Sequence, residues 1–109
     1  MSNVKNEIVG DNGNAYEVKS IKMRYIKNGF YNDYTLLKEI GLIKIYKFKD
    51  GADIVLRFLT AAFNDEEVAK GLIEGDDLDA NMMSEIIEKT RELNGIEYEP
   101  APEITPIQE

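Results

Sequence analysis

The stretch Asp53-Ile-Val-Leu-Arg-Phe-Leu-Thr-Ala-Ala-Phe63 is the most apolar part of this chain, and only Arg57 and Thr60 interrupt it. A helix that is apolar on nearly all of its sides is one that other elements surround. The sequence therefore predicts a central core helix over 53–63, against which the remaining elements pack.

The segment after this core stretch predicts a second helix, because residues 64–67 read Asn-Asp-Glu-Glu and have the form of a capping box. Asn64 is the predicted N-cap, and Glu67 lies three residues further on, as the box requires. The acids of this first turn also suit the positive end of the helix dipole. The helix is expected to run to about Glu74 and to stop at Gly75.

The last helix has the clearest periodicity in the chain. Asp79 is its predicted N-cap, and Asn94-Gly95 marks its predicted end. Its apolar residues recur at helical spacing and fall on one face, as expected for a helix that covers a core. That face consists of Leu78, Met82, Ile86, Thr90 and Leu93, with Met83 and Ile87 at its edge.

Two short helices are expected before the core stretch. Ser20 is the predicted N-cap of the first, which ends at Asn28-Gly29. The second is expected over 35–40, with Asn32 or Asp33 as its cap, so that the residues just before it form an aromatic-rich turn.

Residues 42–48, Leu-Ile-Lys-Ile-Tyr-Lys-Phe, can be read in two ways. Their β-branched and aromatic content suits a strand. Leu37, Ile40, Lys44 and Phe48 nevertheless keep a helical spacing, which favours a helix. The sequence predicts a helix here and leaves a strand as the alternative.

The two ends of the chain differ from this helical centre. Residues 1–19 are predicted to form a β-hairpin, because Asn12-Gly13 is a strong turn signal between two short segments with strand character. The end of the chain, 98–109, is rich in Pro and Glu and is expected to be a flexible tail. The fold class is therefore α+β and mostly α-helical. We expect one compact domain over 1–97, in which the hairpin packs against four to five helices of 20–97.

Composition argues against an enzyme. The chain has 109 residues and contains neither Cys nor His. The usual zinc ligands, thiol nucleophiles and the commonest general acid or base are thus missing. The acidic run at 74–79 lacks the ligand spacing of an EF-hand loop and is explained by a helix stop followed by a helix cap. We expect no catalytic residue, no cofactor and no metal.

Charge is distributed unevenly along the chain. Residues 1–57 carry ten Lys or Arg and seven Asp or Glu, a net charge of +3, while 58–109 carry three and fourteen, a net charge of −11. Such asymmetry can steer partners or drive head-to-tail self-association into a homo-oligomer, although solvated acidic helix faces explain it equally well. The overall charge of −8 disfavours nucleic-acid binding. With neither a signal peptide nor a membrane-spanning stretch, the protein is expected to be soluble and to stay where it is made.

An aromatic cluster interleaved with lysines and arginines is the candidate binding surface. The same composition suits a core with snorkelling lysines, a nucleic-acid stacking surface, or a protein-binding patch. The core reading accounts for it with the fewest assumptions, and the overall acidity places a protein partner above a nucleic acid. The candidate protein-binding residues are Tyr25, Phe30, Tyr31, Tyr34, Tyr46 and Phe48.

Four segments in order carry a family resemblance. They are EIVGDNGNAYEVKSIKM at 7–23, GFYNDYTLLKEIGLIKIYKF at 29–48, DGADIVLRFLTAAFNDEE at 50–67 and MMSEIIEKTRELNGIEY at 82–98. In layout and local character they resemble the small tail assembly chaperones of tailed bacteriophages and of related prophage or contractile-particle clusters. The resemblance covers most of the chain.

The resemblance implies a mostly helical protein with a small β element, without a catalytic site, in the cytoplasm of a bacterial host cell. Such chaperones hold the aggregation-prone tape measure protein and hand it to the tail tube protein, and they often self-associate. Two alternatives remain from the sequence. One is an acidic DNA-mimic inhibitor of a nucleic-acid enzyme, and the other is a small structural tail or baseplate component.

Overall fold

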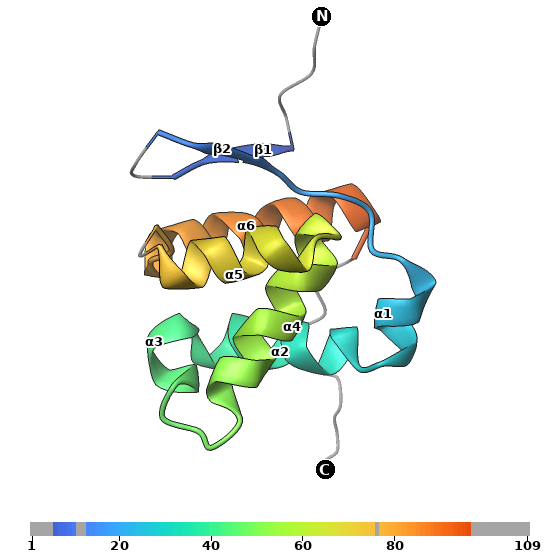
Figure 1. Cartoon of the computed structure of the whole chain (residues 1–109). Coiled ribbons are helices and arrows are strands. Elements are labelled where there is room, and N and C mark those ends of the chain that lie inside the picture. Colours follow the sequence, from blue (N-terminus) through green and yellow to red (C-terminus); the bar gives the residue numbers. More distant parts are fainter. Residues whose placement is uncertain (1–5, 11–12, 76, 97–109) are drawn as a thin grey trace, which may run out of the picture.

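The centre of the structure is helix α4 (Gly51–Phe63), which confirms the core helix predicted over 53–63. In this computed structural model, which describes residues 6–10, 13–75 and 77–96, α4 runs between a pair of helices on one side and a further helix on the other (Figure 1). Its contribution to the core is nearly continuous: Ile54, Val55, Phe58, Leu59, Ala61, Ala62 and Phe63 are all buried.

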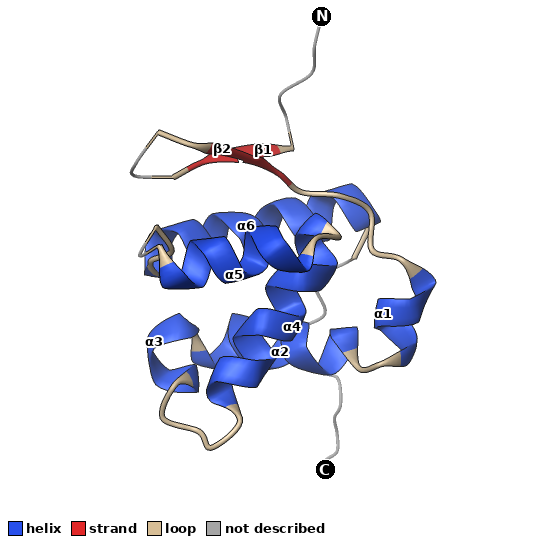
Figure 2. Ribbon diagram, viewed as in Figure 1, coloured by secondary structure: helices blue, strands red, loops and turns tan. Residues whose placement is uncertain are grey.

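Seven further elements complete the described part of the chain, and the α+β, mostly helical class is confirmed (Figure 2). The strands β1 and β2 form an antiparallel hairpin. Helices α2, α3 and α5 lie against α4, while α6 contacts α2, α3 and β1. The elements are β1 (Glu7–Val9), β2 (Ala15–Glu17), α1 (Met23–Lys27), α2 (Phe30–Ile40), α3 (Leu42–Ile45), α5 (Glu66–Glu74) and α6 (Ala80–Asn94).

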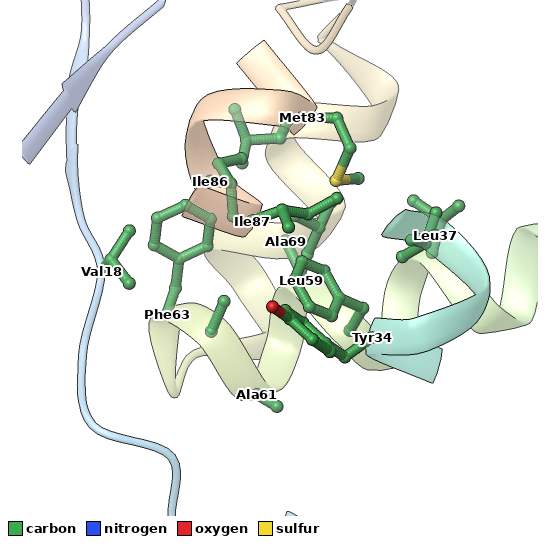
Figure 3. Close-up of a cluster of buried hydrophobic side chains, with 14 of the residues drawn as sticks. Val18, Tyr34, Leu37, Leu59, Ala61, Phe63, Ala69, Met83, Ile86 and Ile87 are labelled. Carbon is green, nitrogen blue, oxygen red and sulfur yellow. The ribbon is translucent and has the colours of Figure 1, made fainter. Parts of the chain in front are cut away.

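One contiguous hydrophobic core joins the helices to the hairpin segment (Figure 3). Leu37 comes from α2, Leu59 from α4, Ala69 from α5 and Met83 from α6, and all four side chains are buried. Val18, which follows β2, lies beside Phe63 of α4 and extends the hydrophobic core to the hairpin (Figure 3). The core therefore spans every layer of the described structure.

Both ends of α6 are placed as the sequence predicts. The Asp79 carboxylate accepts a hydrogen bond from the Met82 amide at 2.8 Å and caps the first turn. At the other end Gly95 adopts a left-handed conformation with φ 67°. The Ile96 amide donates to the Arg91 carbonyl at 2.9 Å, which is the hydrogen bond of a Schellman motif.

The N-cap of α5 differs from the prediction by one residue. Asp65, not Asn64, caps the helix, because its carboxylate accepts hydrogen bonds from the Glu67 and Val68 amides at 3.0 and 3.2 Å. Asn64 instead ends α4 in the left-handed conformation, with φ 54°. Asn tolerates this conformation better than most residues, which allows Asn64 to connect α4 to α5 at a sharp turn.

The predicted start of the first short helix, Ser20, is wrong. Helix α1 begins at Met23, with Lys22 as its N-cap and no side-chain cap. The preceding segment is held by tertiary hydrogen bonds instead, since the Lys19 amide donates to Ala62 of α4 at 2.8 Å and the Ile21 amide to the Asn94 side chain of α6 at 2.9 Å. These bonds keep residues 19–21 out of the helix. The predicted end at Asn28 is confirmed.

The aromatic-rich turn predicted over 30–34 is also wrong, because these residues form the first part of α2. Gly29, with φ 99°, reverses the chain so that the helix can begin at Phe30. Neither Asn32 nor Asp33 acts as a cap, because both lie inside the helix. The predicted interruption at Gly41 is confirmed.

For residues 42–48 the predicted helix is confirmed in part, and the strand is not formed. Residues 42–45 form α3, and Ile45 is completely buried, whereas 46–50 are turns and a bend. Gly51 follows at the start of α4, where an added Cβ would lie 1.9 Å from the Ile45 carbonyl oxygen. The close approach between these two backbones fixes α3 against α4.

The hairpin is docked onto the loop between α5 and α6. Ile8 pairs with Tyr16, and Ile8 is buried. The Tyr16 hydroxyl donates to the Asp77 carboxylate at 2.9 Å, and Asp77 is itself buried. That carboxylate lies so close to Gly10 that an added Cβ there would be 2.2 Å from Oδ2. The predicted tail, 98–109, lies outside the described residues.

We predict that Gly51→Ala lowers the free energy of unfolding by about 2 kcal/mol or more, because the new methyl group must displace the Ile45 backbone. The matched control is Gly71→Ala in α5, where an added Cβ meets nothing within 4 Å. This control should raise the free energy of unfolding by about 0.5–1 kcal/mol. Chemical denaturation measures both, and equal effects of the two variants would contradict the close approach at Gly51.

Tyr16 gives a prediction about pH. Burial, and next the hydrogen bond to Asp77, raise the pKa of Tyr16 above its usual value. The folded protein thus holds this proton more tightly than the unfolded chain. The resulting stabilisation is present below about pH 10 and is lost as the pH rises through the folded-state pKa.

Tyr16→Phe should accordingly lower the free energy of unfolding by about 1.5–3 kcal/mol at pH 7, and the difference from the wild type should shrink above about pH 10. Tyr31→Phe, at an exposed position, is the control and should change little. A difference that stays constant up to pH 12 would contradict this account.

Candidate protein-binding surface

Two of the six predicted binding residues belong to the core. Phe30 and Tyr34 lie one turn apart on the inner face of α2, and their exposed fractions are only 3% and 5%. The Phe30 ring stacks on Phe58 of α4, with 5.7 Å between centroids and 11° between planes. Both side chains therefore join α2 to α4, as the core reading of the aromatic cluster expects.

The other four residues are accessible, but the structure does not bring them together. Tyr31 is exposed on α2, Tyr46 and Phe48 are exposed in the turn after α3, and Tyr25 of α1 is partly buried. Helices α1 and α3 lie at opposite ends of α2 (Figure 1). The predicted cluster is therefore not one patch, and its accessible members belong to separate parts of the surface.

Exposed aliphatic residues beside these aromatics are part of the surface that the sequence reasoning missed. Ile43 of α3 is 72% exposed and Met23 of α1 is 63% exposed, and Ile26 of α1 is also accessible. Helices of five and four residues cannot each hide a full apolar face, and the structure shows α1 and α3 to be shorter than the helices predicted there.

These residues define two exposed apolar corners with basic rims. The α1 corner consists of Lys22, Met23, Arg24, Ile26 and Lys27. The α3 corner consists of Ile43, Lys44, Tyr46, Lys47, Phe48 and Lys49. Each corner thus carries three basic side chains and no acid.

A cleft of about 280 Å³ lies between α1, α2 and α4, beside the α1 corner. Its wall includes an ion pair between Arg57 of α4 and Asp33 of α2. The guanidinium Nε and Nη2 each lie 3.0 Å from a different oxygen of the carboxylate. The cleft is lined by Tyr25, Asn28, Phe30, Asp33, Leu56, Arg57, Thr60, Ala61 and Glu66.

The two members of this ion pair differ greatly in exposure. The Asp33 side chain is 4% exposed, whereas the Arg57 side chain is 52% exposed. The hydrogen bond to Asp33 is the main reason why the pKa of Arg57 is raised above its usual value. The carboxylate is therefore a buried charge that depends on Arg57, while Arg57 still faces solvent.

Helix α1, which forms one wall of the cleft, is attached by polar contacts and buries no residue of its own. The Asn64 side-chain oxygen accepts hydrogen bonds from Arg24 at 3.1 Å and from the Tyr25 hydroxyl at 3.2 Å. The Arg24 guanidinium lies 4.8 Å from the centroid of the Tyr25 ring. The left-handed residue that joins α4 to α5 thus also holds α1 in place.

Several acids of the C-terminal half have structural roles. Asp65 and Asp79 cap helices, and Asp77 is buried beneath the hairpin. Glu66 pairs with Lys70 at 3.6 Å, and Glu88 pairs with Arg91 on the outer face of α6. These acids are explained by folding or by local ion pairs.

Comparisons with protein-family models, with curated proteins and with solved structures find no match to this chain. Within the described ranges, no group of three or more His, Cys, Asp or Glu could hold a metal ion. No helix in those ranges is both long enough and apolar enough to cross a membrane. The two apolar corners and the cleft are therefore taken as the candidate binding features of the described surface.

We predict that Arg57→Met lowers the free energy of unfolding by about 3 kcal/mol, because it leaves the Asp33 carboxylate buried without its partner. The double variant Asp33→Asn/Arg57→Met should recover most of that loss, since no charge is then buried. Arg91→Met, which removes a surface pair, should lower the free energy of unfolding much less. If Arg57→Met and Arg91→Met have equal effects in denaturation, the buried pair does not have the role assigned to it.

Proposed function

We propose that this chain is a non-enzymatic protein-binding protein, and specifically a phage tail assembly chaperone that holds the tape measure protein in the bacterial cytoplasm. The observation that carries the binding role is the position of the exposed apolar side chains. Six of the seven large exposed hydrophobic residues in the described ranges lie between residues 23 and 48, and Val9 is the other.

The energetics of this surface favour binding at several weak points. Fully burying one large apolar side chain is worth roughly 1.5–3 kcal/mol, so each corner alone gives only modest affinity. Helices α1 and α3 lie at opposite ends of α2, so one long partner can contact both corners (Figure 1). Once one corner is bound, binding at the other is intramolecular, and the overall affinity exceeds that of either corner alone. An extended or helical client fits this arrangement better than a small ligand does.

The acidic half of the chain supports the same role in a different way. Glu66, Glu67 and Glu74 are exposed on α5, and three more glutamates are exposed on α6. High net charge keeps a protein with exposed apolar surface soluble. We assign partner binding to the helices α1–α3 and solubility to α5 and α6.

The choice of the tape measure protein as partner, with the tail tube protein as recipient, rests on the resemblance of the four sequence segments. The acidic DNA mimic stays the alternative, because the glutamates of α5 and α6 are exposed, although Asp77 is buried and Asp65 and Asp79 cap helices. A structural tail component would be found in purified particles, whereas a chaperone should be absent from them.

Co-expression tests this function. We expect the chain to raise the soluble fraction of the tape measure protein encoded beside it. The variant Met23→Ser/Ile43→Ser/Phe48→Ser should lose this effect but unfold at nearly the same temperature, because all three side chains are at least half exposed. Val9→Ser, at a position exposed to a similar extent outside the corners, should behave as the wild type.

Two results would contradict the proposal. The first is a soluble fraction of the tape measure protein that does not change when the wild-type chain is present. The second is full activity of the triple serine variant, which would mean that the exposed residues of the two corners do not hold the client.

A further inference from the structure

We propose that the cleft between α1, α2 and α4 receives one large apolar side chain from an acidic segment of the partner protein. This inference rests on the proposed protein-binding function, and it adds the contact surface and the chemistry of the partner segment.

The size and lining of the cleft suit a single anchor side chain. Its volume of about 280 Å³ lies below the range of roughly 300–1,000 Å³ that holds whole small ligands. Leu56 and Ala61 of α4, with Phe30 of α2 and the ring of Tyr25, supply apolar wall. A buried apolar side chain in such a pocket, surrounded by polar contacts, is the usual anchor of a protein interface.

Arg57 gives the cleft a fixed hydrogen-bond donor. An arginine has five N–H donors in a planar fork, and the ion pair uses Nε and Nη2 to hold Asp33. Half of the Arg57 side chain is nevertheless exposed at the cleft. Because Asp33 fixes the guanidinium, its remaining donors can reach a main-chain carbonyl or a carboxylate of the partner at little entropic cost.

The charge around the cleft selects an acidic segment. The two acids that line it are already paired, Asp33 with Arg57 and Glu66 with Lys70. No salt bridge in the described ranges involves Lys22 or Lys27 of the α1 corner. The α1 corner beside the opening contains Lys22, Arg24 and Lys27 and no acid, so an approaching segment meets a positive rim.

The spacing of residues along α1 determines on which side of the helix these charges lie. Tyr25 and Asn28 both line the cleft, and they are three residues apart on one side of the helix. Lys22 lies three residues before Tyr25, on the same side. Lys27 follows Tyr25 by only two residues and so lies on another side of α1, which makes Lys22 the basic residue of the rim nearest to the opening.

Helix α1 is also the wall that can adjust to different anchors. It has five residues, no side-chain cap and no buried residue, and it is held to the end of α4 through the Asn64 side chain. Segments with few buried contacts open at low free-energy cost. An anchor larger than the cleft can be admitted by a shift of α1 while α2 and α4 stay packed.

The test uses fluorescein-labelled peptides and fluorescence anisotropy with the full chain. The probe is Glu-Glu-Ser-Phe-Ser-Glu-Glu, and the controls replace its Phe by Ala or all its Glu by Lys. We expect the Ala peptide to bind at least about tenfold more weakly, because the anchor is lost. The Lys peptide should bind at least as poorly. Equal binding of all three peptides would overturn the inference.

Two matched pairs of variants locate the binding. Thr60→Trp fills the cleft, and Val9→Trp adds the same side chain at an exposed position outside both corners. Lys22→Glu/Lys27→Glu reverses the charge of the α1 corner, and Lys19→Glu/Lys89→Glu makes the same change of charge outside both corners. We expect at least tenfold weaker binding for the first member of each pair and less than twofold change for the second.

Circular dichroism and thermal unfolding check that each variant folds. If Thr60→Trp does not fold, amide NMR shifts of the wild-type chain on titration with the Phe peptide replace it. Shifts gathered at Asn28, Arg57 and Thr60 support the inference, and shifts gathered at the α3 corner overturn it. Tighter binding of a single-stranded oligo-dT at the same residues would also overturn it.

Failure of this inference and failure of the proposed function are distinguishable. If folded Thr60→Trp still raises the solubility of the tape measure protein, the chaperone role stands and the cleft is not its contact surface. If the Phe peptide binds the cleft but the wild-type chain does not help the tape measure protein, the cleft stands and the chaperone role falls.

Discussion

The burial of α4 is the constraint on which the rest of the structure depends. A helix of this composition cannot leave much of its surface in water, so α2, α3 and α5 must lie against it. The two residues that interrupt its apolar run, Arg57 and Thr60, both line the cleft. The polar positions on the core helix therefore mark a strip of α4 where the covering helices leave a hollow.

The ion pair between Arg57 and Asp33 connects this core to the surface. It fixes α2 against α4 through a buried carboxylate, while the stacked rings of Phe30 and Phe58 join the same two helices nearby. A buried charge is costly unless it is paired, so the pair orients both helices rather than simply adding stability. The same contact presents a fixed arginine to the cleft. One interaction thus contributes to the fold and to the proposed binding site.

Much of the fold could be predicted because its signals are local. The continuous apolar run predicted α4, and the cap at Asp79 together with the end at Gly95 predicted α6. Two of the errors arose where the deciding contact is distant in sequence. Asp33 looks like a helix cap, but it pairs with a residue 24 positions later. Ser20 also looks like a cap, but its segment is held extended by bonds to α4 and α6.

The site was predicted less well than the fold for the same reason. Aromatic composition alone does not say which ring faces α4, so Phe30 and Tyr34 could not be separated from Tyr31 before the helix register was known. The cleft depends on how α1 and α2 sit across α4, which no local pattern encodes. Only the interruptions at Arg57 and Thr60 were visible in the sequence as unusual positions.

The central claim is that the helices α1–α3 hold the partner while α5 and α6 keep the complex soluble. Hydrogen exchange of the full chain, measured by mass spectrometry alone and in complex with the tape measure protein, tests it most directly. The account predicts slower exchange in 22–31 and 42–60 and little change on the outer faces of α5 and α6. Protection confined to α5 and α6, with α1 and α3 unchanged, would contradict it.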